Sequence, residues 1–347
     1  MNVVDGLKQL VEFESLNRDQ MQHCMRQIMS GQATPAQIAG FLVALRMKGE
    51  SVEELIGGVQ VMRELVTPVP VHADFHKHLI DTCGTGGDRS GLFNVSTATA
   101  FVVAAAGGHV AKHGNRSVSS TSGSADVLEA AGVKLDLNPE AVARCVHRVG
   151  VGFMFAPAFH SAMKHAIEPR KEMGVRTVFN LLGPMTNPAG AKRQLIGVFH
   201  RDWLRPVAQV LKELGAEHVM VVHSEDGLDE ISIAGRTQFA ELRDGQIRCG
   251  AIMPTVLDIK LGDISSLRVE TPLQSLALIR SALNNVEGPA RDIVVLNAGA
   301  AIHVAGLAED LRGGVKLARE VIASGLAANK LDELAAFSQG LGGPHKA

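Results

Sequence analysis

The stretch that decides the fold is DTCGTGGDRSGLFNVSTATA, residues 81–100, followed by HVAKHGNRSVSSTSGSAD, residues 109–126. Each part begins with an apolar run typical of a β-strand and continues into a loop rich in glycine and hydroxyl side chains. Glycines in the first loop would let backbone N–H groups approach phosphate oxygens without interference from a Cβ atom. The helix that we expect to begin near Asn94 would direct its positive end at the same anion. The two loops together predict a polyphosphate site.

Outside these loops, apolar runs alternate with helical stretches along the chain. Five runs are typical of strands: HLIDTCG, HVAKHG, VGFMFAP, QLIGVFH and EHVMVVHS. Strands that alternate with helices predict a mostly parallel sheet covered by helices on both faces. Ligands of such sheets bind beyond the carboxyl ends of the strands, where both glycine-rich loops lie. The acidic segment HSEDGLDE has a similar position, and the ISIAG that follows it is expected to form another strand.

About the first 70 residues are expected to be wholly helical, because their apolar positions follow a helical period. Three helix starts are marked by capping residues: Asn17, Thr34 followed by Pro35, and Ser51 with Glu54 in a capping box. The segment 67–78 contains two prolines and several polar residues, so we interpret it as a linker.

Composition argues against several kinds of protein. A formal charge of −2 disfavours a surface for nonspecific nucleic-acid binding, which usually needs a basic face. No apolar stretch reaches the length of a membrane span, and the opening MNVVDGLKQL lacks the pattern of a signal peptide, so a cytoplasmic location is expected. The four cysteines form no CxxC pair and the 14 histidines no HExxH pair, so neither a disulfide framework nor a histidine metal centre is indicated.

The phosphate interpretation depends on both loops. GTGGD alone is weak evidence, because glycine turns between strands and helices often serve only close packing. The second loop adds a lysine, an arginine, an asparagine and several serines within residues 112–124, which is too polar for an ordinary turn. Neither a Walker A sequence nor a dinucleotide-type GxGxxG is present, so a different phosphate chemistry is needed.

Six motifs together resemble the anthranilate phosphoribosyltransferase family: GTGGD, FNVSTA, KHGNRSVSS, SGSADVLEAAG, FAPAFHSAMKHAIEPRKEMGVRTVFNLLGPMTNP and GLDEIS. The resemblance runs through nearly the whole chain. It implies a small helical domain, residues 1–70 plus roughly 158–186, and a larger α/β domain, residues 71–157 and 187–347. The stretch from Ala158 to Met173 would complete the helical domain, and the active site would lie in the cleft between the domains. A homodimer formed through the helical domain is also implied.

The implied activity is transfer of the phosphoribosyl group of 5-phosphoribosyl 1-pyrophosphate to the amine of anthranilate, in tryptophan biosynthesis. One alternative is a nucleoside phosphorylase-like enzyme of the same architecture, and the other is a paralogue that binds nucleic acid without catalysis. The paired acidic residues and the NVST block favour the pyrophosphate substrate over the first alternative. The intact KHGNR and DE motifs argue against the second.

The resemblance also implies roles for residues that would bind 5-phosphoribosyl 1-pyrophosphate. Three would cradle the pyrophosphate: Gly84, Gly87 and Asp88. A second group, at the start of a helix and the end of a strand, would hold the ribose-phosphate end: Asn94, Ser96, Thr97 and Lys112. Four would belong to a mobile loop that closes over the substrate: Arg116, Ser119, Ser120 and Ser124. Val95, His113, Gly114 and Asn115 complete the set.

Adjacent carboxylates at Asp229 and Glu230 could hold one or two Mg²⁺ ions against the pyrophosphate, since Mg²⁺ prefers oxygen ligands. A solvated acidic turn is the alternative. By resemblance, Ser96 would add a hydroxyl ligand. Arg170 is implied as the partner of the anthranilate carboxylate, a role that suits the planar guanidinium, although an arginine on a helix is more often a solvated charge. The remaining residues implied around anthranilate are Gly84, His113, Asn115, Pro157 and His160.

No general base is expected, because an aryl amine is already neutral at physiological pH. Positioning and charge stabilisation of the leaving pyrophosphate should supply most of the rate. The sequence departs from the family at Leu92, where threonine is common, so one hydroxyl contact to the phosphoribosyl substrate is expected to be missing. Arg89, nearby, would either add charge at the rim of the loop or face solvent.

Overall fold

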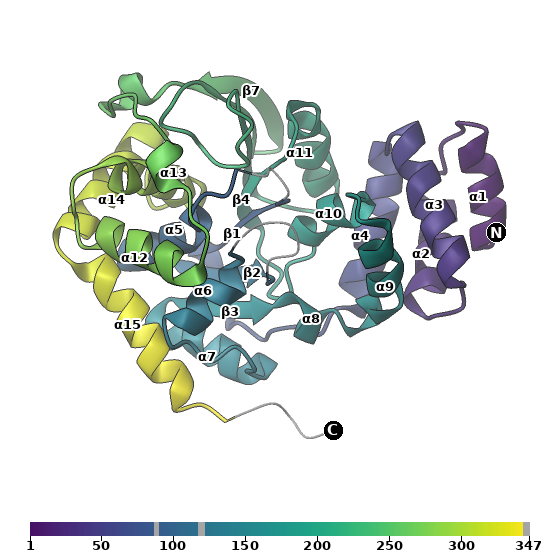
Figure 1. Cartoon of the computed structure of the whole chain (residues 1–347), viewed down its shortest axis with the longest axis horizontal. Coiled ribbons are helices and arrows are strands. Elements are labelled where there is room, and N and C mark those ends of the chain that lie inside the picture. The colour runs from purple at the N-terminus through teal and green to yellow at the C-terminus, as the bar shows by residue number, and fades with distance from the viewer. Residues whose placement is uncertain (87–89, 117–121, 343–347) are drawn as a thin grey trace.

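A sheet runs through the centre of the larger part of the molecule (Figure 1), in a computed structural model that describes residues 1–86, 90–116 and 122–342. The strand order is β3-β2-β1-β4-β5-β6-β7. The strands are β1 (Leu79–Gly84), β2 (His109–Gly114), β3 (Val151–Phe155), β4 (Arg193–Gly197), β5 (His218–Ser224), β6 (Thr237–Arg243) and β7 (Gln246–Ile252). β1 to β5 pair in parallel, whereas β6 and β7 are antiparallel. The mostly parallel sheet and its first five strands are confirmed.

Helices cover both faces of this sheet, as β5 illustrates. Met220 and Val222 pack into the core formed with α5 (Val95–Ala105) and α13 (Pro289–Val304), while Val219 and Val221 pack with α11 (Leu204–Glu213). The alternation follows from the two-residue period of a strand. Further helices of this part are α6 (Ser124–Ala130), α7 (Pro139–Val149), α12 (Pro272–Leu283), α14 (Leu311–Ala323) and α15 (Leu326–Gln339).

The N-terminal part is a bundle of helices, seen in purple in Figure 1. Its helices are α1 (Val3–Val11), α2 (Arg18–Met29), α3 (Pro35–Lys48) and α4 (Val52–Leu65). Asn17, Thr34 and Ser51 each accept a hydrogen bond from the backbone of the first turn, which confirms the predicted helix starts. These caps satisfy donors that the helix itself leaves without partners.

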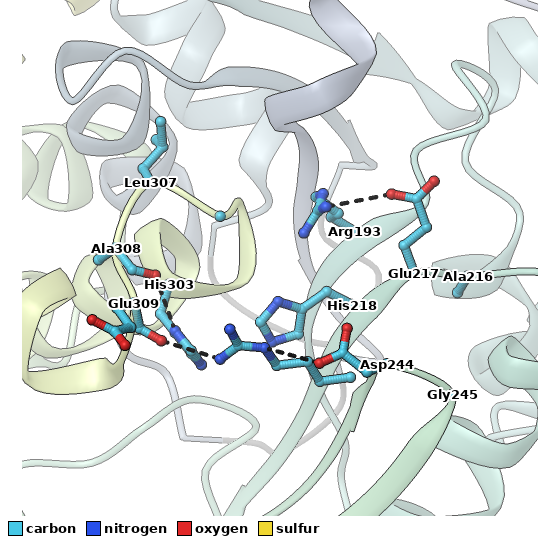
Figure 2. A pocket seen from close by; sticks show the side chains of 12 residues that line it. Arg193, Ala216, Glu217, His218, Asp244, Gly245, His303, Leu307, Ala308 and Glu309 are labelled. Carbon is cyan, nitrogen blue, oxygen red and sulfur yellow. Dashed lines mark hydrogen bonds and ion pairs between the residues drawn. The ribbon is translucent and has the colours of Figure 1, made fainter.

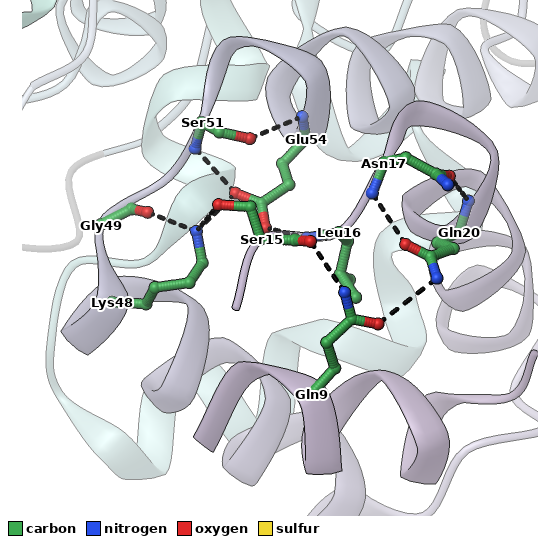
Figure 3. Close-up of polar contacts among 9 residues, drawn as sticks. All are labelled: Gln9, Ser15, Leu16, Asn17, Gln20, Lys48, Gly49, Ser51 and Glu54. Atoms are coloured by element: carbon green, nitrogen blue, oxygen red, sulfur yellow. Dashed lines mark hydrogen bonds and ion pairs between the residues drawn. The ribbon is translucent and has the colours of Figure 1, made fainter. Parts of the chain in front are cut away.

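A buried carboxylate holds this bundle together (Figure 3). Glu54 is fully buried, and its oxygens accept hydrogen bonds from the backbone N–H groups of Leu16 and Ser51, at 2.8 and 2.7 Å. Lys48 Nζ lies 2.9 Å from Glu54 Oε2, and this ion pair is also almost inaccessible to solvent. A buried charge is tolerated only when it is paired and hydrogen-bonded, and Glu54 meets both conditions.

Later segments return to this bundle. α9 (Lys164–Met173) packs against α2 and α3, and α10 (Val178–Leu182) packs against α4. The predicted helical stretch from Ala158 to Met173 is interrupted, because α8 (Ala156–Phe159) ends before a short 3-10 turn, Ser161–Met163, that precedes α9. The domain boundaries inferred from the sequence stay a prediction.

Two other segments differ from expectation. The linker at 67–78 contains a 3-10 helix, Ala73–His78, and Phe75 stacks on His147 with ring centroids 4.5 Å apart, so it packs against the α/β part. The predicted strand ISIAG is wrong, because the backbone of Ile231 bonds to the side chain of Asn297 and not to a neighbouring strand. Among the helices that the structure describes, none combines the length and apolar character needed to span a bilayer.

Candidate active site

A pocket of about 410 Å³ lies between the carboxyl ends of the central strands and the helical bundle. Its walls include Gly84 at the end of β1, Lys112 on β2, Met62 from α4 and Arg170 from α9. The pocket therefore occupies the position expected of ligand sites in parallel sheets. It also lies in the predicted cleft between the helical bundle and the sheet.

The acidic pair forms one wall of this pocket. Asp229 Oδ2 accepts a hydrogen bond from the backbone N–H of Gly86 at 2.9 Å, and Glu230 Oε1 accepts one from that of Ser96 at 3.1 Å. Ser96 Oγ in turn accepts a hydrogen bond from Lys112 Nζ at 3.2 Å. The geometry therefore gathers two carboxylates and one hydroxyl, all oxygen donors, beside a buried cation.

Glycines in two strands allow this close approach. A Cβ atom at Gly197, the last residue of β4, would lie 1.5 Å from the carbonyl oxygen of Asp229, and one at Gly84 would lie 2.6 Å from Asp229 Oδ2. Real Cβ atoms do not approach backbone oxygens so closely. The acidic segment can therefore rest on the sheet only because Gly197 carries no side chain, whereas a side chain at Gly84 would displace the Asp229 carboxylate.

Asn297, which the sequence analysis did not single out, fixes the same segment from below. Its fully buried amide accepts a hydrogen bond from Ile231 N–H at 2.9 Å and donates one to Ile231 C=O at 2.8 Å. Ile231 directly follows Glu230, so these two hydrogen bonds fix the position of the backbone that carries the acidic side chains. A lone asparagine in the apolar run VVLNAGAA was the available signal.

Lys112 and Asp81 form a buried polar layer beneath the pocket. Lys112 Nζ donates to the carbonyl of Thr82 as well as to Ser96, and burial lowers the pKa of Lys112 while Asp81 opposes the change. Asp81 accepts hydrogen bonds from His113 N–H at 3.2 Å and Asn187 Nδ2 at 2.7 Å. Burial raises the pKa of Asp81, and the charge of Lys112 opposes that shift. The sequence analysis missed Asp81, although a carboxylate in the apolar run HLIDTCG was a visible signal.

Arg170 projects from α9 into the opposite side of the pocket. Its guanidinium lies 5.1 Å from the centroid of the Phe179 ring, and burial lowers the pKa of Arg170 to about 10. This guanidinium makes no hydrogen bond or ion pair with the residues that the structure describes. A partly buried cation without an anion is costly, so this group is suited to receive a carboxylate from a ligand.

Two histidines lie in the same pocket with their rings in contact. The ring centroids of His113 and His160 are 4.9 Å apart, and neither Nε2 atom has a hydrogen-bond partner within the described ranges. Burial lowers the pKa of His113 to about 3 and that of His160 to about 4. Both rings are therefore neutral at pH 7, and each can donate a hydrogen bond to a ligand or accept one from it.

Most of the residues predicted for the site line this one pocket. They are Gly84, Asn94, Val95, Ser96, Lys112, His113, Gly114, Asn115, Arg116, Ser124, Pro157, His160, Arg170, Asp229 and Glu230. Gly87, Asp88, Ser119 and Ser120 lie outside the described residues, as does Arg89. Thr97 is an exception, since its side chain is buried and does not line the pocket. On helix α5 it points away from the face that carries Ser96.

Two of these residues have other partners in the structure. The side chain of Asn94 bonds to Ser122 and to Ser275 Oγ, the latter at 2.7 Å, so it ties the second loop to α12. Arg116 pairs with Asp126 and Glu129 at 2.9 and 2.7 Å on the exposed rim. Leu92 lines the pocket where a threonine was expected.

Comparison with known proteins agrees with the family resemblance noted in the sequence, over nearly the whole chain. Residues 4–66 match a family model described as "Glycosyl transferase family, helical bundle domain", and residues 76–328 match the corresponding a/b domain. The chain is 59% identical to the anthranilate phosphoribosyltransferase of Cellvibrio japonicus, over 98% of this chain and 99% of the relative. It is 58% identical to that of Thioalkalivibrio sulfidiphilus, over 97% and 99%.

Solved structures share the fold. The anthranilate phosphoribosyltransferase of Thermus thermophilus superposes with a TM-score of 0.90 at 44% identity, covering 96% of this chain and 99% of the other. That of Saccharomyces cerevisiae, in complex with PRPP and Mg, superposes with a TM-score of 0.88 at 23% identity, covering 98% of each chain. The second likeness extends the fold to a distant sequence.

Proposed function

The chain belongs to the anthranilate phosphoribosyltransferase family, and on this premise we propose that it transfers the phosphoribosyl group of 5-phosphoribosyl 1-pyrophosphate to the amine of anthranilate. The products are N-(5-phosphoribosyl)anthranilate and pyrophosphate, and the step belongs to tryptophan biosynthesis. The observation that carries the proposal is that the partly buried Arg170, without an anionic partner in the described residues, shares one pocket with the acidic pair Asp229 and Glu230. In a nucleoside phosphorylase-like reaction no aryl carboxylate takes part, so Arg170 would have no carboxylate to bind.

The phosphoribosyl substrate is assigned to the strand-end side of the pocket. Its phosphates would lie at the first glycine-rich loop and the positive end of α5, beside the buried charge of Lys112. Gly84, Asn94, Ser96 and the neighbouring pocket residues predicted above are proposed to bind it. The contributions of Gly87, Asp88, Ser119 and Ser120 rest on the family resemblance, and Thr97 would act only through its backbone.

The donor set of the acidic wall fits Mg²⁺. Asp229, Glu230 and Ser96 present carboxylate and hydroxyl oxygens on the pocket side, and Mg²⁺ is held by one or two carboxylates together with substrate phosphates. When bound, Mg²⁺ would neutralise negative charge on the departing pyrophosphate. The hydrogen bonds from Gly86 and Ser96 already hold these carboxylates in place.

Anthranilate is assigned to the opposite side, where Arg170 would bind its carboxylate. The neutral rings of His113 and His160, with Asn115 and Pro157 near the entrance, would surround the aromatic amine. Because this amine is neutral, the chain needs to hold it in line with the anomeric carbon and exclude water, and needs no general base. Buried, neutral histidines serve that purpose without adding charge near an oxocarbenium-like sugar.

The experiment is to follow the loss of anthranilate fluorescence when the protein meets anthranilate, 5-phosphoribosyl 1-pyrophosphate and Mg²⁺. We expect loss only with all three components. Arg170→Ala should raise the KM for anthranilate, and Asp229→Asn should raise the Mg²⁺ concentration needed. No loss with the intact protein, or variants that both match the intact protein in KM for anthranilate and in Mg²⁺ requirement, would contradict the proposal.

We also propose a cytoplasmic homodimer without nucleic-acid binding. α1, α3 and the adjacent turn leave large apolar side chains exposed, with Phe13 66% and Met47 71% accessible. Such side chains gathered on one bundle are typical of an interface. A monomeric mass by light scattering at micromolar concentration would contradict the dimer, and salt-resistant DNA binding would contradict the last point.

A further inference from the structure

A second pocket, of about 650 Å³, opens at the amino ends of the parallel strands (Figure 2). Arg193 and His218, the first residues of β4 and β5, line it, together with His303 near the end of α13. The candidate active site lies at the carboxyl ends of the parallel strands, so the two pockets are separated by about the length of a strand. Nothing in the reaction proposed above uses this second pocket.

The two histidines of its wall, His218 and His303, both contact the carboxylate of Glu241, which is not itself among the lining residues. His218 Nε2 lies 2.7 Å from Glu241 Oε1, and His303 Nε2 lies 2.9 Å from the same oxygen. One ligand atom from each residue lies within 4.8 Å of the other two, which makes this a group able to hold a metal ion among the described residues. Both histidines are buried, and the Glu241 side chain is 17% exposed.

We propose that His218, Glu241 and His303 form a binding site for a divalent transition-metal ion of the Zn²⁺ class. Two imidazole nitrogens and one carboxylate oxygen are a three-residue set that Zn²⁺ accepts, with water in the fourth position. Ligand atoms around tetrahedral Zn²⁺ are about 3.3 Å apart, given bonds of about 2.0 Å. The two contacts with Glu241 would therefore need to lengthen by about half an ångström, and the two histidine ligand atoms, which lie within 4.8 Å of each other, would need to take the same spacing. Because His218 and His303 line the pocket, water could reach an ion held between them.

The surroundings favour an ion at this point. His303 Nδ1 lies 3.4 Å from the carbonyl oxygen of Ala308, a partner that would leave Nε2 as the coordinating atom. His303 also lies in the last turn of α13, where the helix dipole favours a cation. Both hydrogen bonds to Glu241 use Oε1, and within the described ranges Oε2 has no hydrogen-bond partner, so it can turn toward an ion.

The site would join three elements, because His218 begins β5, Glu241 lies in β6 and His303 lies in α13. α13 also carries Asn297, which holds the backbone of Ile231 beside the acidic pair of the first pocket. A bound ion would therefore fasten the helix that supports the catalytic segment. The ligands are 23 and 62 residues apart in sequence, a spacing that no short metal motif describes.

The test is Zn²⁺ titration of the full-length protein by calorimetry, in excess Mg²⁺ to occupy the acidic pair, with thermal unfolding measured alongside. We expect one saturable Zn²⁺ that raises the melting temperature. Glu241→Gln and His303→Asn should each weaken Zn²⁺ binding by more than roughly 10- to 100-fold, which is the usual cost of losing a residue that only hydrogen-bonds to a metal ligand. His200→Asn, which removes an exposed histidine beside Asp202, should leave the affinity unchanged.

Two readouts separate a metal site from a hydrogen-bonded cluster that serves folding alone. Co²⁺ in place of Zn²⁺ should give the visible absorption of a tetrahedral centre in the intact protein and not in Glu241→Gln. Glu241→Gln is nearly isosteric, and its circular dichroism spectrum checks that it folds. Absence of saturable Zn²⁺ binding, or equal Zn²⁺ affinity in the intact protein and both ligand variants, would overturn the proposal.

Discussion

The two ends of the parallel sheet carry polar pockets of different character. At the carboxyl end, the Nε2 atoms of His113 and His160 have no hydrogen-bond partner among the described residues, and the Arg170 guanidinium has no anionic partner there. At the amino end, His218 and His303 share the carboxylate of Glu241. Polar groups buried without partners reduce stability, so a fold retains them where a ligand completes them. Groups that satisfy one another add to stability without a ligand, although the same arrangement can also accept a metal ion.

The fully partnered Glu54 of the helical bundle should show the largest effect on stability. Glu54→Ala removes the acceptor of Lys48, Leu16 and Ser51, and leaves a buried ammonium without an anion. We expect a loss of about 4 kcal/mol in the free energy of unfolding, measured with urea. Glu53→Ala, which removes an exposed ion pair with Arg18, is the control and should cost under about 1 kcal/mol. Equal losses would break the distinction between partnered and solvated charges.

Gly197→Ala should show the largest effect on activity by displacing the acidic pair. The new Cβ would overlap the carbonyl oxygen of Asp229, so that segment must move away from the pocket. Misplacement by about 1 Å costs on the order of 100-fold in rate, and we expect at least that loss in the fluorescence assay. Gly235→Ala is the control, because its Cβ would meet no atom within 4 Å. Unchanged activity in Gly197→Ala would show that the acidic segment tolerates movement.

Local signals in the sequence were sufficient for much of this architecture. The five parallel strands and the capped helices of the bundle follow from runs and caps that lie close together in the chain. The hairpin of β6 and β7 was missed, although Asp244-Gly245, with φ of 51° and 71°, is the Asp-Gly signal of a two-residue turn. The sequence Asp244-Gly245 was therefore sufficient to predict this hairpin turn.

The buried residues that hold the site in place, Asp81 and Asn297, could not be predicted from the sequence for a different reason. Asp81 bonds Asn187 across 106 residues, and Asn297 bonds Ile231 across 66. A lone polar residue in an apolar run indicates that a partner exists, but its identity depends on which strands and helices become neighbours. Family resemblance supplied the pocket residues themselves, while these supports emerge only from the folded chain.

The two buried histidines of the active-site pocket should make stability depend on pH. Their pKa values in the folded state, about 3 for His113 and about 4 for His160, lie below the unfolded value near 6.5. The unfolded chain therefore binds more protons in this range, and stability that is complete above pH 6.5 falls as the pH drops toward 4. Each histidine should account for about 2 kcal/mol between pH 7.5 and pH 5. His160→Asn should reduce that loss in urea unfolding by its own share, and an unchanged pH profile would contradict the assignment.

Arg116 combines features of the two pockets, because it lines the active-site pocket and yet forms ion pairs with other side chains. Its ion pairs with Asp126 and Glu129 are exposed, and exposed pairs contribute under about 1 kcal/mol. Glu129→Ala should therefore change the free energy of unfolding by less than that amount. It should also lower the KM for 5-phosphoribosyl 1-pyrophosphate, by about threefold, if a weakly held Arg116 exchanges Glu129 for phosphate.

Arg116→Ala completes this comparison, because it should raise the same KM while also leaving stability nearly unchanged. A KM that responds to neither variant would place Arg116 with the solvated surface charges. A response in opposite directions would instead show that a partnered group can still serve a ligand, provided its partners are exposed. Burial of the partner, and not its mere presence, would then separate Arg116 from Glu54, whose contacts are shielded from water.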